Sequence, residues 1–249
     1  MPIALITGAS RLKSIGAAVA RQLAFDGYDI ALSYWSGYDE RMPWGNEPRD
    51  VSSIVEPVRA SGRRCIAIEA DLGVAQTPAE LFDAVERDLG AVDAIVLSHC
   101  ESVDSGILDT SIESFDLHFA VNARANWLMM REFALRYRGT IGRGRIVALT
   151  SDHVVHNMAY GASKGALDRI TIAAAHELGH LGITANTINP GANDTGWMTD
   201  EQRASVAAST ALRRVSQPGD VANLVSFLCS EAGGWITGQT LYSDGGASR

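Results

Sequence analysis

The sequence predicts one doubly wound α/β domain, built on a central, mostly parallel seven-stranded sheet with helices on both faces. Short apolar segments alternate along the chain with segments of helical periodicity that run for about ten residues or more. The apolar segments carry few polar side chains, as expected of parallel strands that helices cover on both faces. Such alternation produces right-handed crossovers between parallel strands. The expected architecture is therefore a Rossmann-type sheet, which binds ligands at the carboxyl ends of its strands.

Seven segments are expected to be strands because they are short, apolar and bounded by Gly, Pro or polar residues. They are 2–6, 28–34, 64–70, 92–98, 145–149, 184–188 and 240–242. Apolar periodicity predicts helices over 14–27, 51–61, 78–89, 112–138, 159–180 and 218–230. Ser14 is the expected N-cap of the first helix and Gly27 its end. The Pro- and Gly-bearing stretch 35–50 is expected to be a loop.

Length and charge limit the classes of function. A chain of 249 residues suffices for one large domain that buries roughly three-quarters of its unfolded surface. We expect a cofactor half at about 1–150, a catalytic and substrate half at about 151–249, and a lid at about 192–215. The net charge of −8, without a basic cluster, argues against nucleic acid as the main partner.

The location of the protein is predicted from its cysteines and its apolar runs. Three isolated cysteines indicate reduced thiols in a cytoplasmic protein. No basic leader precedes the first apolar run, and no apolar stretch reaches the roughly 20 residues of a membrane span. We therefore expect a cytoplasmic protein without a membrane partner.

The stretch from Thr7 to Gly16, TGASRLKSIG, joins the first expected strand to the first helix. Glycine lets the backbone approach a pyrophosphate, and the start of the helix supplies free N–H groups. An ordinary strand-to-helix turn is the alternative, because the pattern departs from G-x-G-x-x-G. An NAD site has an acidic residue about 20 positions after this loop. No carboxylate follows the second strand until Asp39, whereas Arg11 and Lys13 lie in the loop, so NADP(H) is predicted ahead of NAD(H).

Residues of several types fall at one edge of the expected sheet, where the strands end. They are Gly8, Asp71, Ser98, Ser151 and Asn189. After the fifth strand, Tyr160 and Lys164 are four residues apart on a predicted helix, so their Cβ atoms are about 5–6 Å apart. A fixed ammonium beside a tyrosine favours the phenolate and so lowers the pKa of the phenol. Without the rest of the chain, an incidental surface Tyr and Lys is the favoured interpretation of this pair.

Seven motifs occur in order: TGASR…IG at 7–16, ADL at 70–72, VNARA at 121–125, GRIVALTS at 144–151, YGASK at 160–164, NPG with Thr195 at 189–195, and ITGQTLYSDGG at 236–246. With them the chain resembles the classical short-chain dehydrogenase/reductases along nearly its whole length. The nearest branch is that of the 3-oxoacyl-carrier-protein reductases. The resemblance implies an NADP(H)-dependent oxidoreductase that moves hydride between nicotinamide and a ketone or secondary alcohol, free or thioester-bound. It also implies a homotetramer or homodimer that pairs through the helices at 112–138 and 159–181, with the carboxyl-terminal segment at another interface.

The same resemblance assigns four catalytic residues. Tyr160 is the implied general acid and base, and Lys164 holds the nicotinamide ribose and lowers the Tyr160 pKa. Ser151 hydrogen-bonds the substrate oxygen, and Asn122 supports a water relay from Lys164 to solvent. The implied cofactor-binding residues are Gly8, Ala9, Ser10, Arg11, Ser14, Ile15, Tyr34, Asp71, Leu72, Ser98, Tyr160, Lys164, Pro190, Gly191, Asn193 and Thr195.

Three positions depart from the family pattern. Leu12-Lys13-Ser14 replaces the central glycine of the loop, which resembles the enoyl-reductase version, although those enzymes space Tyr and Lys seven apart rather than four. Ser98-His99-Cys100-Glu101 replaces the usual Asn-Asn-Ala-Gly, and the sequence explains no role for Glu101. Ser151 precedes Tyr160 by nine residues, about four fewer than usual, so Thr150 or His153 could share its role.

Two other functional classes remain open. His176-Glu177-Leu178-Gly179-His180 matches H-E-x-x-H, the zinc motif of metallopeptidases, but it falls at the expected helix end and has no third ligand nearby. We therefore expect no metal site. A protein that binds NADP(H) without catalysis is the second alternative. The presence of all four implied catalytic residues argues against it. The segment Gly196–Thr210, with Trp197 and Met198, is either a lid or a plain surface helix.

Overall fold

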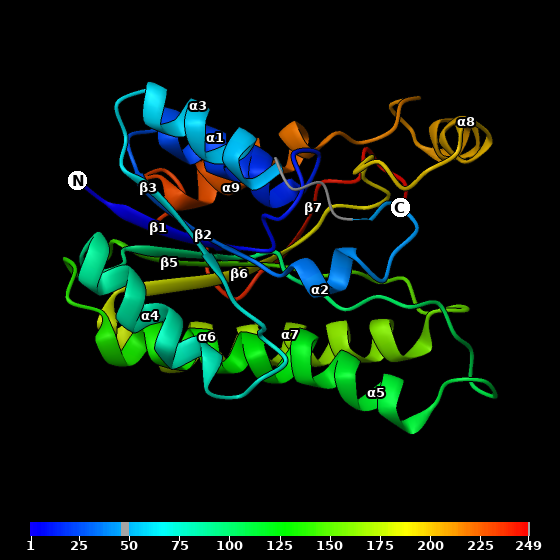
Figure 1. Cartoon of the computed structure of the whole chain (residues 1–249), viewed down its shortest axis with the longest axis horizontal. Coiled ribbons are helices and arrows are strands. Elements are labelled where there is room, and N and C mark those ends of the chain that lie inside the picture. The colour runs from blue at the N-terminus through cyan, green and yellow to red at the C-terminus, as the bar shows by residue number, and fades with distance from the viewer. Residues whose placement is uncertain (46–49, 249) are drawn as a thin grey trace.

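A central sheet lies between two layers of helices in the computed structural model, which describes residues 1–45 and 50–248 (Figure 1). The strands are β1 (Ile3–Thr7), β2 (Asp29–Tyr34), β3 (Cys65–Glu69), β4 (Ala94–Leu97), β5 (Gly144–Leu149), β6 (Ile183–Asn189) and β7 (Thr240–Tyr242). Their order is β3-β2-β1-β4-β5-β6-β7, and every neighbouring pair is parallel. The prediction of a doubly wound, seven-stranded sheet is confirmed, and the sheet is parallel throughout.

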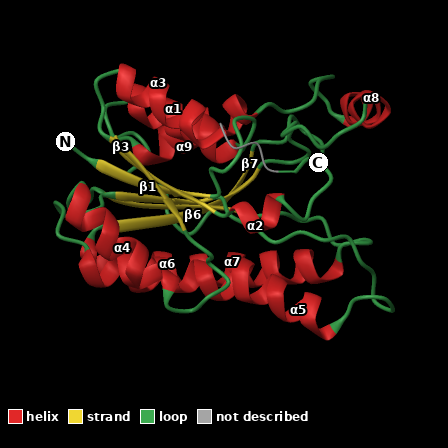
Figure 2. Cartoon of the chain, in the orientation of Figure 1, coloured by secondary structure: helices red, strands yellow, loops and turns green. Residues whose placement is uncertain are grey.

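Helices cover both faces of the sheet (Figure 2). They are α1 (Ile15–Phe25), α2 (Ser36–Asp39), α3 (Asp50–Ala60), α4 (Thr77–Asp88), α5 (Ile112–Phe119), α6 (Ala125–Arg136), α7 (Met158–Glu177), α8 (Asp200–Ser209) and α9 (Pro218–Cys229). One layer holds α1, α3 and α9, and the other holds α4, α6 and α7 (Figure 1). No helix among the described residues combines the length and the apolar character that crossing a bilayer requires.

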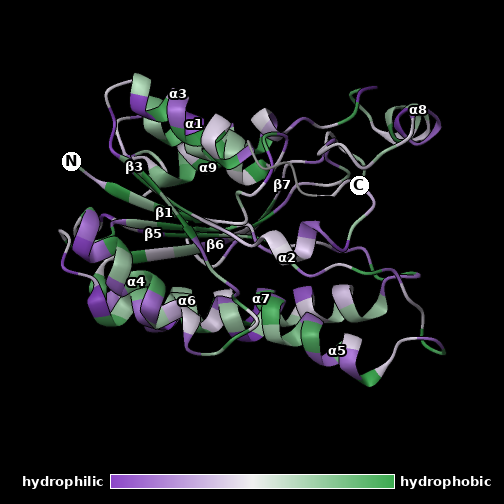
Figure 3. Cartoon of the chain, viewed as in Figure 1, coloured by the Kyte–Doolittle hydropathy of each residue, from purple (hydrophilic) through white to green (hydrophobic). Residues whose placement is uncertain are grey.

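Alternation along the strands divides the core in two. In β1, Ala4 and Ile6 pack with the layer of α1 and α9, whereas Ile3 and Leu5 pack with the layer of α4, α6 and α7. Successive side chains of a strand point to opposite faces, so an apolar strand supplies both layers at once. Figure 3 shows the apolar strands at the centre, whereas the helices around them carry both hydrophobic and hydrophilic residues. This buried sheet fixes the edge at which the strands end.

The structure differs from the predicted elements in two places that matter for function. The stretch 35–50 was predicted to be a loop, but Ser36–Asp39 forms the short helix α2; residues 46–49 lie outside the described part. The helix predicted over 112–138 is interrupted by a π turn at Ala120–Arg124, which separates α5 from α6. A π turn carries an extra residue within a helix, and such turns are frequent at functional sites.

Candidate active site

Tyr160 and Lys164 lie one turn apart near the start of α7, beside the carboxyl end of β5. Lys164 is buried, and its Nζ donates a hydrogen bond to the Leu149 carbonyl oxygen at 2.8 Å. The same Nζ lies 5.6 Å from the centre of the Tyr160 ring. Burial lowers the pKa of Lys164, and the nearby Cys100 and Asp168 oppose this shift. The pair therefore shares one face of the helix, as its spacing predicts.

Ser151 reaches Tyr160 in spite of the short loop between them. The Ser151 hydroxyl hydrogen-bonds to the Tyr160 phenol and by itself lowers the pKa of Tyr160. Burial is the larger effect and, together with Cys100, raises the pKa of Tyr160 well above its ordinary value, which is opposite to the lowered pKa that the sequence predicted from Lys164. The phenol is consequently neutral at neutral pH and carries a proton that it can donate.

The other two residues considered for the role of Ser151 point elsewhere. The Thr150 hydroxyl is buried and donates to the Lys164 carbonyl oxygen at 3.5 Å, so it braces the helix. His153 is exposed, and its backbone N–H donates to the Ser151 Oγ at 3.1 Å. Ser151 alone of these three therefore hydrogen-bonds to the Tyr160 phenol in the described residues.

Asn122 lies in the π turn and binds the chain that follows β4. Its Oδ1 accepts a hydrogen bond from the Glu101 N–H at 2.8 Å, and its Nδ2 donates to the Glu101 carbonyl at 2.8 Å. Nδ2 also donates to the Ser163 Oγ on α7 at 2.9 Å. Asn122 thus holds the backbone after β4 against α7. Its predicted part in a water relay stays a proposal.

Glu101, for which the sequence offered no role, is the buried partner of an arginine. Arg41 donates to both Glu101 carboxylate oxygens, with N···O distances of 3.2 and 2.8 Å. Only 4% of the Glu101 side chain is exposed, and a carboxylate at such a depth needs a cation to offset its lost hydration. Arg41 is in the segment between β2 and α3, far from Glu101 in the sequence, so no local pattern could have shown the pair.

The loop between β1 and α1 packs closely against neighbouring backbone at its glycines. Gly8 has φ 72°, and a Cβ there would lie 2.7 Å from the backbone of Ser98 and His99. A Cβ on Gly16 would lie 2.8 Å from the Gly8 carbonyl oxygen. Ser14 caps α1 by accepting from the Ala17 N–H at 3.1 Å, as predicted. The loop and the start of α1 therefore fit the pyrophosphate of a dinucleotide.

Arg11 in this loop faces a carboxylate, which corrects one premise of the cofactor prediction. Its Nε lies 3.2 Å from Asp39 Oδ1, and one terminal nitrogen donates to the Thr195 carbonyl at 3.1 Å. The Ser10 hydroxyl also donates to Asp39. The sequence placed Asp39 too far along the chain to face the loop, but α2 brings it back.

The remaining predicted cofactor residues gather at the same edge of the sheet. Tyr34 ends β2, Asp71 and Leu72 follow β3, Ser98 follows β4, and Pro190 and Gly191 follow β6. Asn193 and Thr195 come next, and the Arg11 bond to Thr195 ties this segment to the loop after β1. The predicted convergence at the strand ends is thus observed in the fold, while the roles of these residues stay predictions.

The comparisons with known proteins agree with this geometry. The family model described as enoyl-(acyl carrier protein) reductase matches residues 8–248. The uncharacterised oxidoreductase YjdA of Bacillus subtilis (strain 168) is 34% identical over 99% of this chain and 97% of its own length. The chain belongs to the short-chain dehydrogenase/reductase family.

Two solved short-chain dehydrogenase/reductase-like structures share the whole architecture. A blue fluorescent protein from a metagenomic library, in complex with NADPH, has a TM-score of 0.88 and 29% identity, covering 100% of this chain and 98% of its own. The angucycline C-6 ketoreductase LanV with bound NADP has a TM-score of 0.85 and 28% identity, covering 99% of this chain and 95% of its own. The similarity therefore extends over the entire fold of each protein.

The H-E-x-x-H motif of this short-chain dehydrogenase/reductase lacks the helical geometry that zinc binding requires. The helix α7 ends at Glu177, and His180 lies in the following 3-10 turn, Gly179–Leu181. The His180 Nδ1 is hydrogen-bonded to the Glu177 carbonyl oxygen at 2.8 Å. Residues 1–45 and 50–248 hold no group of three or more potential ligands that could bind a metal ion. The zinc hydrolase alternative is therefore not supported.

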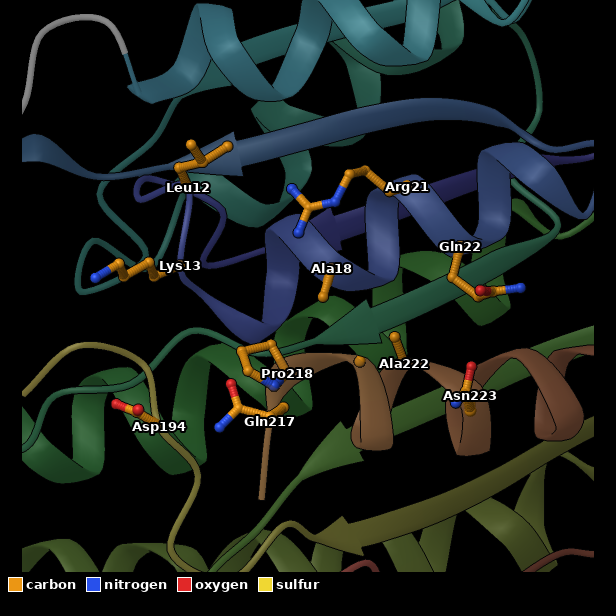
Figure 4. Close-up of a pocket in the computed structure, with 11 residues that line it drawn as sticks. Leu12, Lys13, Ala18, Arg21, Gln22, Asp194, Gln217, Pro218, Ala222 and Asn223 are labelled. Carbon is orange, nitrogen blue, oxygen red and sulfur yellow. The ribbon is translucent and has the colours of Figure 1, made fainter. Parts of the chain in front are cut away.

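A surface hollow of about 620 Å³ lies behind the glycine loop of this short-chain dehydrogenase/reductase (Figure 4). Its walls come from the loop after β1, from α1 and from the start of α9. Figure 4 shows Lys13, Asp194, Gln217 and Asn223 around it. Neither Tyr160 nor Ser151 lines it, although Leu12 and Lys13 of the glycine loop do.

The segment predicted to be a lid is only partly packed. Met198 is buried, whereas Trp197 is 47% exposed and its Nε1 donates to the Asn193 carbonyl at 3.2 Å. No residue of α8 is buried, and the helix projects from one end of the molecule (Figure 1). A capping box at Thr199 and Gln202 starts α8. Closure of this segment over the site stays a prediction.

We expect Gly8→Ala to lower the free energy of unfolding by about 3 kcal/mol, because it adds a clash to a left-handed backbone. Urea unfolding of the variant measures this loss. Gly62→Ala is the matched control, since Gly62 has φ 83° but open space around its Cβ position. It should cost only about 1 kcal/mol. Equal losses in the two variants would show that close packing at Gly8 is unimportant.

His99 is a buried neutral histidine at the end of β4, and it makes stability depend on pH. Its Nδ1 is 2.6 Å from the Thr7 Oγ1, and the Asn126 Nδ2 donates to its Nε2 at 3.3 Å. Burial lowers the pKa of His99 from 6.5 to about 3. His99 of the unfolded chain therefore binds a proton near pH 6.5, whereas His99 of the folded chain stays neutral. The free energy of unfolding consequently falls as the pH is lowered from 6.5 toward 3.

We expect this histidine to lower the free energy of unfolding by about 2 kcal/mol between pH 7 and pH 5. His99→Asn, which keeps an acceptor for Thr7, should remove that part of the acid sensitivity. Urea unfolding at the two pH values measures the difference. Parallel pH dependence in the two proteins would mean that His99 is protonated in the folded state.

Sequence reasoning missed three residues near the site: Asp39, Arg41 and Trp44. The Trp44 Nε1 donates to Asp39 Oδ1 at 2.8 Å, and the Arg11 guanidinium lies 4.5 Å from the centre of the Trp44 ring. The available signal was the density of aromatic and charged residues in a supposed loop. The role of these residues depends on their contacts with the loop after β1 and with the chain after β4, and hydrophobic periodicity does not reveal such contacts.

Proposed function

We propose that this protein is an NADP(H)-dependent reductase of ketones, with Tyr160 as its proton donor. The observation that carries the proposal is a neutral phenol hydrogen-bonded to Ser151, one helical turn from the buried Lys164, at the strand-end edge that also carries the glycine loop. NADPH and NADP are bound in the two similar structures, one of which is a ketoreductase. These names support the choice of cofactor and of reaction.

The residues of the loop fit the proposed cofactor. Glycine at positions 8 and 16 lets the loop pack closely against the chain after β4 and against α1, and the start of α1 supplies N–H groups for a pyrophosphate. Ser10 and Arg11 would hold the adenosine phosphate, and Asp71 with Leu72 would line the adenine. A bound nicotinamide supplies the hydride that the carbonyl carbon receives.

The reaction then needs one proton at the carbonyl oxygen, and Tyr160 donates it. The raised pKa of Tyr160 keeps that proton on the phenol until negative charge develops on the oxygen. Ser151 donates a hydrogen bond to the same oxygen and stabilises the charge. Lys164 holds the ribose, and its charge stabilises the phenolate that remains. Asn122 fixes the chain after β4 and would anchor a relay that returns the proton.

The spacing of Tyr160 and Lys164 favours carbonyl reduction over enoyl reduction. The family model carries an enoyl-reductase description, but enoyl reductases resembling this chain space the two residues seven apart, and here they are four apart. Three apolar side chains, Val154, Val155 and Trp197, are exposed between Ser151 and Tyr160 and at the lid, next to exposed polar residues such as His153. We therefore propose an apolar ketone, free or thioester-bound, as the substrate.

We propose a homotetramer, a cytoplasmic location and reduced cysteines. Apolar side chains are exposed on α5 and α6, at Ile112 and Trp127, and on α9 and after it, at Phe227 and Trp235. Two separate apolar faces suit the two kinds of interface that a tetramer with dihedral symmetry requires. Cys65 and Cys229 are buried and Cys100 partly so, all as free thiols.

Oxidation of NADPH, followed against β-ketoacyl thioesters, polycyclic ketones, quinones and aldehydes, tests the proposed function. We expect turnover with at least one apolar ketone and little with simple aldehydes. Tight binding of NADPH without turnover of any member of the panel would instead favour a non-catalytic dinucleotide-binding protein. Absence of both binding and turnover would contradict the proposal altogether.

A further inference from the structure

The segment 36–45, here called the strap, folds from the end of β2 back over the loop after β1. Within it, Asp39 is 2% exposed, and donors surround its carboxylate. Trp44 donates through Nε1 at 2.8 Å, Arg11 approaches through Nε at 3.2 Å, and the Ser10 hydroxyl donates as well. The strap thus places a buried negative charge against two side chains of the glycine loop.

The strap is also tied to the chain after β4. Arg41 forms the bidentate ion pair with Glu101, and the Tyr38 hydroxyl donates to the Ser102 carbonyl oxygen at 3.3 Å. The Arg41 guanidinium lies 5.6 Å from the centre of the Tyr38 ring. These contacts explain why Glu101 is present where the family has glycine: its carboxylate anchors the strap. Asp39 is therefore held at the loop by contacts on both of its sides.

Asp39 lies at the corner where a Rossmann-type sheet receives the adenosine ribose. That ribose sits at the end of the second strand, where an acidic residue binds a 2′-hydroxyl or an arginine binds a 2′-phosphate. The loop and β2 meet here, since the Ala9 N–H donates to the Ser33 carbonyl at 3.1 Å. Ser10 and Arg11 are the hydroxyl and the guanidinium at this corner, and both are engaged by Asp39.

We propose that Asp39 competes with the 2′-phosphate of NADP(H) for Ser10 and Arg11, and so sets how strongly the protein prefers NADP(H) over NAD(H). The inference rests on the proposed binding of a nicotinamide dinucleotide. A phosphate bound to these donors meets the Asp39 carboxylate, and two like charges at that distance repel. The 2′-hydroxyl of NAD(H) can instead donate to the same carboxylate. Asp39 thus weakens the binding of NADP(H) and does not weaken the binding of NAD(H).

The test compares ligands that differ by one phosphate: NADPH with NADH, and 2′,5′-ADP with 5′-AMP. Isothermal titration calorimetry gives their Kd values for the wild type and for Asp39→Asn, which keeps the shape and an acceptor oxygen. We expect Asp39→Asn to raise the preference for the phosphorylated ligand about tenfold in both pairs. Trp44→Phe keeps a ring beside Arg11 but removes a donor to Asp39, so the carboxylate depends more on Ser10 and Arg11 and the preference should fall about threefold.

Glu40→Gln is the matched control, because it removes one negative charge from the exposed next residue of the same strap. It should change the preference less than twofold, since an exposed charge is screened. An unchanged or reduced preference in a folded Asp39→Asn variant would overturn the inference and would mean that Asp39 orients Arg11 for the phosphate. A wild type that binds none of the four ligands would overturn the proposed function, and the inference with it.

Discussion

Tyr160→Phe is expected to lower kcat for ketone reduction about a thousandfold, because it removes the proposed proton donor at the carbonyl oxygen. The substitution should leave the rest of the site in place, since phenylalanine keeps the ring beside Lys164. The Kd for NADPH should stay within about twofold, as the hydroxyl contributes little to dinucleotide binding. Initial rates of NADPH oxidation and calorimetric titration measure the two quantities separately.

Tyr137→Phe is the control for this experiment. The Tyr137 hydroxyl donates to the Thr140 carbonyl at 2.8 Å at the far end of α6, so its loss should leave kcat unchanged. If Tyr160→Phe retains wild-type kcat, another group donates the proton and the assignment of the site is wrong.

Lys164→Met is expected to lower kcat/KM about a thousandfold, through weaker binding of the ribose and loss of the charge that stabilises the phenolate. Methionine is long and apolar, and it suits a side chain that is buried along its length. The free energy of unfolding should change by only about 1 kcal/mol, because the lost bond to Leu149 is offset by relief of a buried charge. Rates, Kd for NADPH and urea unfolding together distinguish these effects.

Arg169→Met serves as the control, since it removes a cation from an exposed position of the same helix. It should leave kcat/KM unchanged. A Lys164→Met protein that is folded, binds NADPH normally and keeps its activity would remove Lys164 from the mechanism.

The sequence predicted the sheet well because parallel strands are encoded locally. Each strand is a short apolar run bounded by polar residues or glycine, and helices of regular periodicity separate the runs. Right-handed crossovers then restrict the orders that the strands can take. For the same reason Gly8, Ser151 and Asn189 were expected at one edge, where the structure has them.

The strap could not be predicted in this way, because its structure depends on partners distant in the sequence. Arg41 is paired with Glu101 and Asp39 with Arg11, and neither pair repeats at a helical or strand period. From the sequence, NADP(H) was predicted because no carboxylate was expected to face the loop. Asp39 faces it, so the choice of NADP(H) now rests on similar proteins, and Asp39 becomes the residue that modulates it.

The proposed catalytic residues were easier to place than their surroundings. The four-residue spacing of Tyr160 and Lys164 fixes their common face on any helix. The position of Ser151 was in doubt because its loop is short, yet the Ser151 hydroxyl reaches the phenol. The contacts of Asn122 with Glu101 were unpredictable, since they arise from the π turn that interrupts the expected helix.

Transfer of deuterium from NADPH labelled at the nicotinamide C4 tests the proposed reaction most directly. The reaction is run with an apolar ketone from the substrate panel, and the alcohol product is examined by NMR and mass spectrometry. We expect one deuterium on the carbinol carbon, on a single face, with the hydroxyl proton supplied by solvent through Tyr160. An alcohol without deuterium at that carbon, or a product formed by hydrolysis, would contradict the assignment of this site to carbonyl reduction.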